Sequence, residues 1–289
     1  MTIKQAIDVA TRKLSAEPIG PPGRAAEALM LHVLGCERAY LHAHPERELT
    51  AEEQRRFEEV VARRTAGEPL QYITGHQEFH GLEFMVTPAV LIPRPETEHL
   101  VEAALEVLRD FLSLKPRIVD VGTGTGCIPL AIAHELKKHR RAAEIHGVDI
   151  SRDALAVARR NAERLGFATD VEFHEGDLLA PFADTPECFD MVISNPPYVG
   201  RDEADKVQRE VREHEPTVAV FAGAKGLDIY RRLIPQARAA LRPGGHLLME
   251  IGYSIEERVL GLLNGFEHVR TVADLQGIPR VVVARRAAS

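Results

Sequence analysis

Glycine and threonine alternate in the segment Asp120-Val121-Gly122-Thr123-Gly124-Thr125-Gly126. The segment joins an apolar run at residues 117–121, which predicts a strand, to a helical pattern that begins near Cys127. Because glycine has no Cβ, its backbone can turn tightly and approach a ligand closely. These residues predict a loop at the end of a strand that holds a ligand against its backbone.

The residues around the glycines indicate which ligand the loop suits. A dinucleotide fingerprint would need glycine where this chain has Cys127, and it would place the carboxylate of Asp120 beside a diphosphate. S-adenosylmethionine has no phosphate and brings an ammonium and a sulfonium group, which suit that carboxylate better. The alternative is a turn that serves packing alone. Such a turn gives no reason for three glycines, which lose more conformational entropy on folding than other residues. The predicted S-adenosylmethionine loop comprises Asp120, Gly122, Thr123, Gly124, Thr125 and Gly126.

Two further acidic residues follow apolar runs downstream of the glycines. Asp149 ends the run at residues 145–148, where a carboxylate can accept both hydroxyls of a ribose; its alternative role is at the cap of the helix near Ser151. Asp177, with Leu178 after it, follows the third predicted strand, where an adenine amino group is expected. The alternative for Asp177 is a loop carboxylate without a ligand.

A second motif, Asn195-Pro196-Pro197-Tyr198, comes directly after the apolar run at residues 189–194. The two prolines fix φ and remove two N–H donors, so the Asn195 side chain and the Pro196 carbonyl are presented rigidly. Two neighbouring acceptors suit one NH2 group of a substrate. Alone, the motif could be a turn or a polyproline ligand; its position at a strand end downstream of the glycine loop favours an active site.

The elements that would position these residues alternate between strands and helices beyond Lys115. This alternation predicts an α/β fold with a doubly wound parallel sheet and helices on both faces. Helical spacing over residues 1–70 predicts a small N-terminal helical domain. Aromatic and β-branched residues separated by glycine and proline predict a β-hairpin connector at residues 71–93. The second domain then covers residues 94–289.

Composition limits the partners and the environment. The chain has 36 Lys plus Arg and 43 Asp plus Glu, a net charge of −7 that disfavours stable binding to nucleic acid. Its 3 cysteines are widely spaced, which predicts no disulfide framework and fits a reducing cytoplasm. No signal peptide or membrane-spanning run is apparent, so we expect a cytoplasmic, unprocessed protein with no membrane partner. The 13 histidines are scattered, and we expect no metal site.

The chain resembles the HemK/PrmC family of N5-glutamine methyltransferases, which modify peptide chain release factors. Asn-Pro-Pro-Tyr is shared with N6-adenine DNA methyltransferases, so it indicates the accepting NH2 group and not the substrate. Ile-Pro-Arg-Pro-Glu-Thr-Glu distinguishes the release factor enzymes from ribosomal-protein glutamine methyltransferases. The resemblance spans nearly the whole chain and rests on Gly67 to Gly75, Leu91 to Glu98, Asp120 to Gly126, Asn195 to Tyr198, Gly226-Leu227-Asp228 with Tyr230, and Glu250-Ile251-Gly252.

The resemblance implies a Rossmann-like class I methyltransferase domain and a helical domain that docks the substrate. It implies methyl transfer from S-adenosylmethionine to the side-chain amide of the glutamine in the Gly-Gly-Gln motif of release factors. Asn195 and Pro196 would accept the two N–H bonds of that amide, and Tyr198 would pack against its flat face. Many relatives carry an aromatic residue at the position of Leu178, so aliphatic or phenylalanine contacts would hold adenine here.

Other functions remain alternatives at this stage. They are an N6-adenine nucleic-acid methyltransferase, a ribosomal-protein glutamine methyltransferase, an S-adenosylmethionine-binding scaffold without turnover, and a nicotinamide oxidoreductase. The acidic charge disfavours the nucleic-acid enzyme, and the intact Asn-Pro-Pro-Tyr motif disfavours the scaffold. We expect a monomer that acts on release factors without stable nucleic-acid binding.

Overall fold

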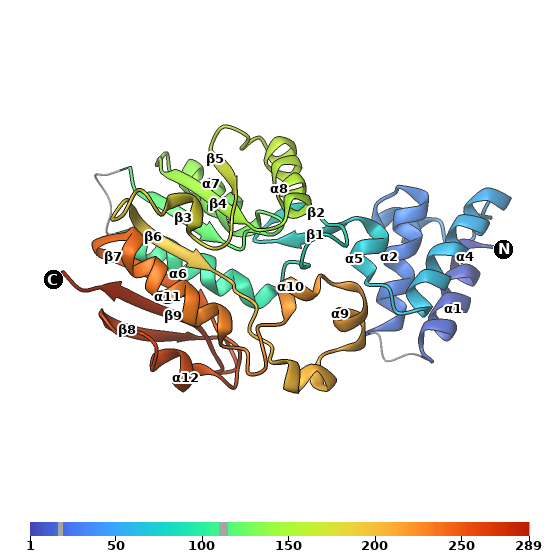
Figure 1. Ribbon diagram of the computed structural model, residues 1–289. Coiled ribbons are helices and arrows are strands. Elements are labelled where there is room, and N and C mark those ends of the chain that lie inside the picture. Colours follow the sequence, from blue (N-terminus) through green and yellow to red (C-terminus); the bar gives the residue numbers. More distant parts are fainter. Residues whose placement is uncertain (17–19, 110–114, 289) are drawn as a thin grey trace. The chain divides into compact units, whose positions relative to one another are not determined.

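The computed structural model describes residues 1–16, 20–109 and 115–288, and the chain divides into two compact units (Figure 1). The helical unit comprises residues 1–76 and 207–214, and the sheet unit comprises residues 77–206 and 215–289. The chain therefore leaves the sheet unit after Lys206 and returns to it at Glu215. The segment between them lies with the helical unit, which the sequence does not predict.

In the helical unit, amphipathic helices pack around one apolar cluster that includes Leu14, Leu29 and Phe57. The helices with residues in this cluster are α1 (Ile3–Leu14), α2 (Pro22–Leu34), α3 (Arg38–Ala43), α4 (Ala51–Thr65) and α5 (Leu70–Thr74). The helix α9 (Arg209–His214) belongs to the same unit but has no residue in the cluster. Thr2 and Thr50 begin α1 and α4 with capping boxes, in which side chains satisfy backbone N–H groups at the helix start. The helical domain expected from the sequence is present; α1, α2 and α4 are its long helices, and α3, α5 and α9 are short.

The sheet unit is built on seven strands among the described residues, in the order β5-β4-β3-β6-β7-β9-β8. The pairs among β3 to β7 are parallel, and β9 runs antiparallel to both β7 and β8. The strands are β3 (Arg117–Val121), β4 (Glu144–Asp149), β5 (Val171–Glu175), β6 (Phe189–Ser194), β7 (Leu241–Glu250), β8 (Phe266–Ala273) and β9 (Pro279–Arg286). The predicted α/β fold is confirmed.

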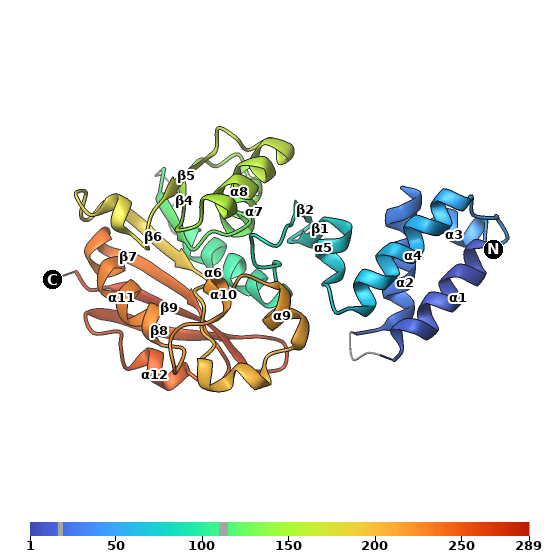
Figure 2. The same cartoon turned by 45° about the vertical axis from the view of Figure 1, so that its right-hand side comes forward.

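Helices cover both faces of this sheet (Figure 2). Leu100 and Leu130 belong to the apolar cluster on one face, and Leu233 and Val259 belong to the cluster on the other. The strand order reverses direction between β3 and β6, so their carboxyl ends open a crevice where ligands bind in such sheets. The remaining elements are α6 (Glu98–Leu108), α7 (Cys127–Lys138), α8 (Arg152–Leu165), α10 (Thr217–Val220), α11 (Asp228–Ala240), α12 (Glu256–Leu260), and the 3-10 turns Pro95–Thr97, Ala180–Phe182 and Arg201–Lys206.

Within the predicted connector at residues 71–93, the hairpin consists of β1 (His76–Phe79) and β2 (Leu82–Met85). The first residues of the predicted connector, 71–74, instead lie in α5. This helix follows Pro69 and ends at Gly75, which has the left-handed conformation. Asn161 of α8 holds the hairpin: its side-chain amide accepts the N–H of Met85 and donates to the Met85 carbonyl.

None of the helices in the described residues combines the length and the apolar character that crossing a membrane requires.

Candidate active site

A cavity of about 230 Å³ lies at the reversal of strand order in the sheet unit. Its wall contains Val121, Asp149, Gly176 and Asn195, which stand at or just beyond the ends of β3, β4, β5 and β6. Of the residues predicted from the sequence, the cavity wall includes Gly122, Gly124, Asp149, Asp177, Leu178, Asn195 and Pro197. The other predicted residues are not among those that line the cavity: Asp120, Thr123, Thr125, Gly126, Pro196 and Tyr198.

The three glycines of the turn have different surroundings. All have positive φ, at +77° for Gly122, +54° for Gly124 and +78° for Gly126. A Cβ on Gly122 or Gly124 would meet nothing within 4 Å, so the backbone at these two positions is open. A Cβ on Gly126 would come within 3.3 Å of Leu130 and Ala158, so this glycine permits close packing of the helix that follows. The first two glycines line the cavity.

Asp120 is fully buried at the end of β3, and neither of its carboxylate oxygens has a hydrogen-bond partner among the described residues. Burial raises the pKa of Asp120 to about 7; the hydroxyl of Thr123 reduces this effect without making a hydrogen bond of normal geometry, and the charge of Asp149 adds to it. A buried carboxylate without a partner is costly unless a cation or a donor arrives. Asp120 is therefore suited to a cationic ligand group.

Asp149 both lines the cavity and holds the glycine turn. Its Oδ2 accepts the N–H of Gly124 at 2.9 Å, and its Oδ1 accepts the N–H of Ser151 at 2.9 Å. Ser151 is the residue that caps α8, through its hydroxyl and the N–H of Ala154. The two alternatives from the sequence are thus compatible: one lone pair of each oxygen is used locally, and a second remains for a ligand hydroxyl. Burial raises the pKa of Asp149.

Asp177 is already engaged by a basic residue of the same cavity wall. Arg232 of α11 donates to its carboxylate in an ion pair, and both side chains are about half exposed. Leu178 follows with a φ of +54°, a conformation that is unfavourable for a side chain with a Cβ. This backbone presents Leu178 to the cavity as an aliphatic wall.

Asn195 is held by a buried hydrogen-bond chain. Its Nδ2 donates to the hydroxyl of Thr97 at 3.0 Å, and that hydroxyl donates to Glu250 Oε2 at 2.7 Å. Thr97 and Glu250 are each only 2% exposed. When Glu250 is ionised, the single hydroxyl proton of Thr97 goes to Glu250 and the oxygen of Thr97 accepts from Asn195. Burial raises the pKa of Glu250 to about 7, so this arrangement predominates above that pH. The chain thus fixes the orientation of the Asn195 amide and leaves its Oδ1 for another donor.

Tyr198 is not among the residues that line the cavity and packs against the apolar cluster on one face of the sheet. A Cβ on Gly252 would come within 2.8 Å of its ring, and a Cβ on Gly226 would come within 2.1 Å of its carbonyl oxygen. Burial, and then the charge of Glu250, raise the pKa of Tyr198. Both glycines are therefore required by close packing around the Asn-Pro-Pro-Tyr loop.

Several cavity residues were not predicted from the sequence. Ile150 is 57% exposed and Val218 is 61% exposed, although both line the cavity. Ile150 carries a recognisable signal, since it directly follows the acid at a strand end. Pro216 and Val218 carry none: they reach the wall because buried Glu215 accepts the N–H of Ile92 and the guanidinium of Arg94.

Comparison with known proteins identifies the relatives of this chain. A family model described as "PrmC N-terminal domain" matches residues 5–75, and one described as "Methyltransferase domain" matches residues 113–270. The release factor glutamine methyltransferase of Koribacter versatilis is 52% identical over 289 residues, covering 100% of both chains. The chain belongs to the release factor glutamine methyltransferase family. The enzyme of that name from Geobacter sulfurreducens is 41% identical over 98% of this chain and 96% of its own.

Solved structures agree with the fold of this release factor glutamine methyltransferase family member. The catalytic domain of hMettl16, solved with an RNA hairpin, has a TM-score of 0.55 at 17% identity and covers 80% of this chain and 82% of its own. At that identity the likeness concerns the fold alone. The family, the methyltransferase class and the Rossmann-like fold predicted from the sequence are confirmed.

Proposed function

We propose that this protein transfers a methyl group from S-adenosylmethionine to the side-chain amide nitrogen of the glutamine in the Gly-Gly-Gln motif of peptide chain release factors. The observation that carries the proposal is the fixed Asn195 amide, whose Oδ1 is left for a donor at the cavity. The names of the full-length relatives support the release factor as substrate.

S-adenosylmethionine, the methyl donor of this class of enzyme, fits the residues that are present. Asp120 offers a buried carboxylate without a partner, which suits an ammonium group, and Gly122 and Gly124 offer open backbone. Asp149 retains acceptor capacity for ribose hydroxyls, and Leu178 and Ile150 offer aliphatic surface for adenine. When bound, the cofactor supplies an electrophilic methyl group on sulfur.

The residues of the loop act on the accepting nitrogen. An amide nitrogen is a poor nucleophile because its lone pair is delocalised into the carbonyl. Asn195 Oδ1 and the Pro196 carbonyl accept hydrogen bonds from its two N–H groups, which fixes its direction of attack and stabilises the positive charge that develops on it. This charge is neutralised when the methylated nitrogen loses one of its two N–H protons. Neither acceptor must reorganise: the prolines hold one, and the chain through Thr97 to Glu250 holds the other.

A direct assay tests this proposal. Labelled S-adenosylmethionine is incubated with a whole release factor, a Gly-Gly-Gln peptide, the same peptide with glutamate in place of glutamine, a ribosomal protein and adenine-containing oligonucleotides. Mass mapping should locate one methyl group on the Gly-Gly-Gln glutamine, and the glutamate peptide should remain unmodified. Methyl transfer to adenine, or to the ribosomal protein in preference to the release factor, would overturn the proposal.

We further propose that the helical unit docks the release factor, and that the protein acts as a monomer in the cytoplasm without stable nucleic-acid binding. The residues assigned to cofactor contact all lie in the sheet unit. Deleting residues 1–76 should preserve cofactor binding and lower the rate on a whole release factor more than on the peptide. Because the deletion also removes the ion pair from Arg64 to Glu210, full-length Glu210→Gln is the matched control. Equal losses on both substrates would leave the unit a purely structural role.

A further inference from the structure

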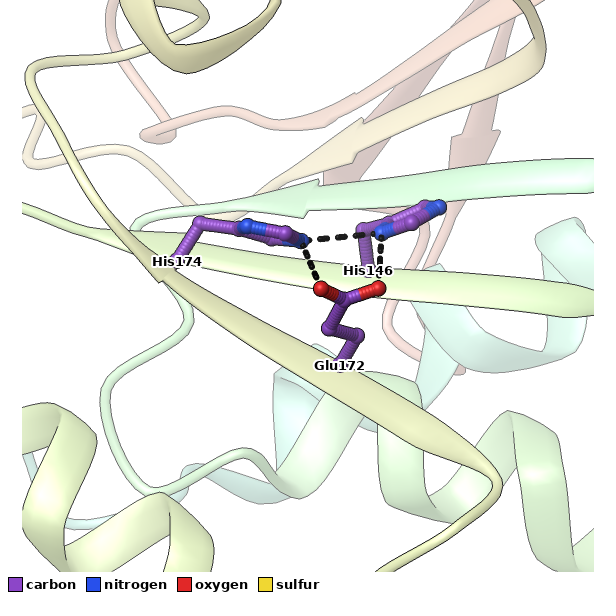
Figure 3. Close-up of side chains that lie close together, drawn as sticks. All are labelled: His146, Glu172 and His174. Carbon is purple, nitrogen blue, oxygen red and sulfur yellow. Dashed lines mark hydrogen bonds and ion pairs between the residues drawn. The ribbon is translucent and has the colours of Figure 1, made fainter.

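Two histidines and a glutamate converge on one face of the sheet at its edge (Figure 3). His146 lies on β4, and Glu172 and His174 lie on β5, which is the edge strand. In the parallel register His146 pairs with Glu172, and His174 stands two residues further along, so all three side chains leave the same face. The cluster stands apart from the cavity of the proposed methyl transfer, since none of its members lines that cavity.

The ligand atoms lie close enough together for one small cation. His146 Nδ1 and His174 Nε2 are 3.0 Å apart, Glu172 Oε2 lies 3.8 Å from the first, and Glu172 Oε1 lies 3.7 Å from the second. One ligand atom from each residue lies within 4.8 Å of the other two. A tetrahedral zinc ion with bonds of about 2.0–2.1 Å has ligands roughly 3.3 Å apart. The observed distances fall on both sides of that value, so small side-chain adjustments would accommodate the ion.

A second carboxylate determines which ring nitrogen of His146 carries the proton. Glu144 Oε1 lies 3.0 Å from the Nε2 of His146. An ionised carboxylate can only accept, so Nε2 carries the proton and Nδ1, which faces the cluster, presents its lone pair. Arg117 holds Glu144 in place by donating to the same oxygen at 2.8 Å. This lone pair accepts the Nε2–H of His174 at 3.0 Å, and a bound ion would replace that hydrogen bond. A carboxylate on the other ring nitrogen is the arrangement that surrounds metal-bound histidines in proteins.

One side chain of the cluster is buried, and the other two are accessible to solvent. His146 is only 5% exposed and contacts the rings of Phe182 and Phe189, which hold its ring. The side chain of His174 is 24% exposed and that of Glu172 is 70% exposed. An ion can therefore approach from solvent, and water can complete its coordination.

We propose that His146, His174 and Glu172 form a binding site for a divalent transition-metal ion of the zinc type. Imidazole nitrogens and one carboxylate are the ligands that such ions prefer over magnesium or calcium. The ion joins β4 to the edge strand β5 just before the segment that carries Asp177 and Leu178. The site is thus structural: it stabilises the strand edge that precedes one wall of the cavity.

Titration of the chelator-treated, full-length protein with Zn²⁺, followed by calorimetry, tests the site. One equivalent should bind and raise the melting temperature, and Co²⁺ should give the visible absorption bands of a tetrahedral complex. Glu172→Gln and His174→Gln should each weaken Zn²⁺ binding by at least about 10-fold, the lower range seen even for groups that only support metal ligands. Both substitutions are at accessible positions, which favours normal folding.

The matched control is His268→Gln, because His268 is an exposed histidine of β8 with an acidic neighbour, Glu267, and lies outside the cluster. This variant should bind Zn²⁺ as the wild type does. Three results would overturn the site: no binding of one equivalent by the wild type, unchanged affinity in both cluster variants, or an equal loss of affinity in His268→Gln. The last result would assign the binding to surface histidines in general.

Discussion

The side chain of Asn195 is fixed by Thr97, a residue 98 positions earlier in the chain, through a 3.0 Å hydrogen bond from its amide nitrogen. Thr97 in turn donates to buried Glu250, so the amide has one orientation at the cavity. This relationship gives a role to Thr97 in the Ile-Pro-Arg-Pro-Glu-Thr-Glu stretch and to Glu250 in Glu-Ile-Gly. Both segments position the acceptor of the proposed reaction.

Replacing Thr97 tests that role. Thr97→Val keeps the shape of the side chain but removes the hydroxyl, so Asn195 loses its acceptor and Glu250 its donor. We expect the single-turnover methyl-transfer rate to fall by roughly 10-fold to 100-fold with nearly unchanged cofactor affinity. Thr97→Ser retains the hydroxyl and should recover most of the rate. Equal rates in the valine and serine variants would contradict a positioning role.

Asn195 itself distinguishes an acceptor from a donor. Asn195→Ala should lower the rate by on the order of 100-fold or more while cofactor affinity is largely retained. Asn195→Asp keeps an accepting oxygen but cannot donate to Thr97, whose proton goes to Glu250 when that carboxylate is ionised, above its raised pKa of about 7. We therefore expect the Asp variant to be about as poor as the Ala variant, with the cofactor saturating in single-turnover assays. Wild-type rates in both variants would remove Asn195 from the active site.

Asp149 is expected to matter for cofactor affinity. In Asp149→Ala the ribose loses a charged acceptor worth roughly 1.5–3 kcal/mol, which corresponds to a loss of about 10-fold or more in affinity. The loss of the bonds to Gly124 and Ser151 should also lower the melting temperature. Ser151→Ala is the control, since it removes the cap of α8 and leaves Asp149 intact. If calorimetry shows the same affinity in Asp149→Ala as in the wild type, Asp149 is only a capping residue.

We expect cofactor binding to release protons from Asp120. With its pKa raised to about 7 by burial, Asp120 is partly protonated at neutral pH, and an arriving ammonium group favours the ionised form. Binding should release protons near pH 7, and affinity should increase as the pH rises through 7 and then level off. Calorimetry in buffers of different ionisation enthalpy measures the released protons. Asp120→Asn should reduce their number, whereas equal proton release in both proteins would exclude Asp120 as their source.

Much of this protein is determined by patterns that are local in the sequence. The capping boxes at Thr2 and Thr50 and the glycine turn after β3 depend on residues within a few positions, so their conformation can be inferred from the chain itself. The alternation of strands and helices predicts the parallel sheet. Parallel strands bring their carboxyl ends to one edge, so Asp149 and Asn195, which stand at strand ends, are expected at that edge, and both line the cavity there.

Only the tertiary structure decides how distant residues pair. The bonds from Asn195 to Thr97 and from Thr97 to Glu250 span 98 and 153 positions, and no periodicity encodes them. The ion pair of Asp177 with Arg232 also depends on how α11 packs against the sheet. The His146, Glu172 and His174 cluster depends on strand register, because a shift of one residue would turn one strand's side chains to the opposite face. Local sequence thus specifies the turns and elements, whereas packing and register specify the contacts between them.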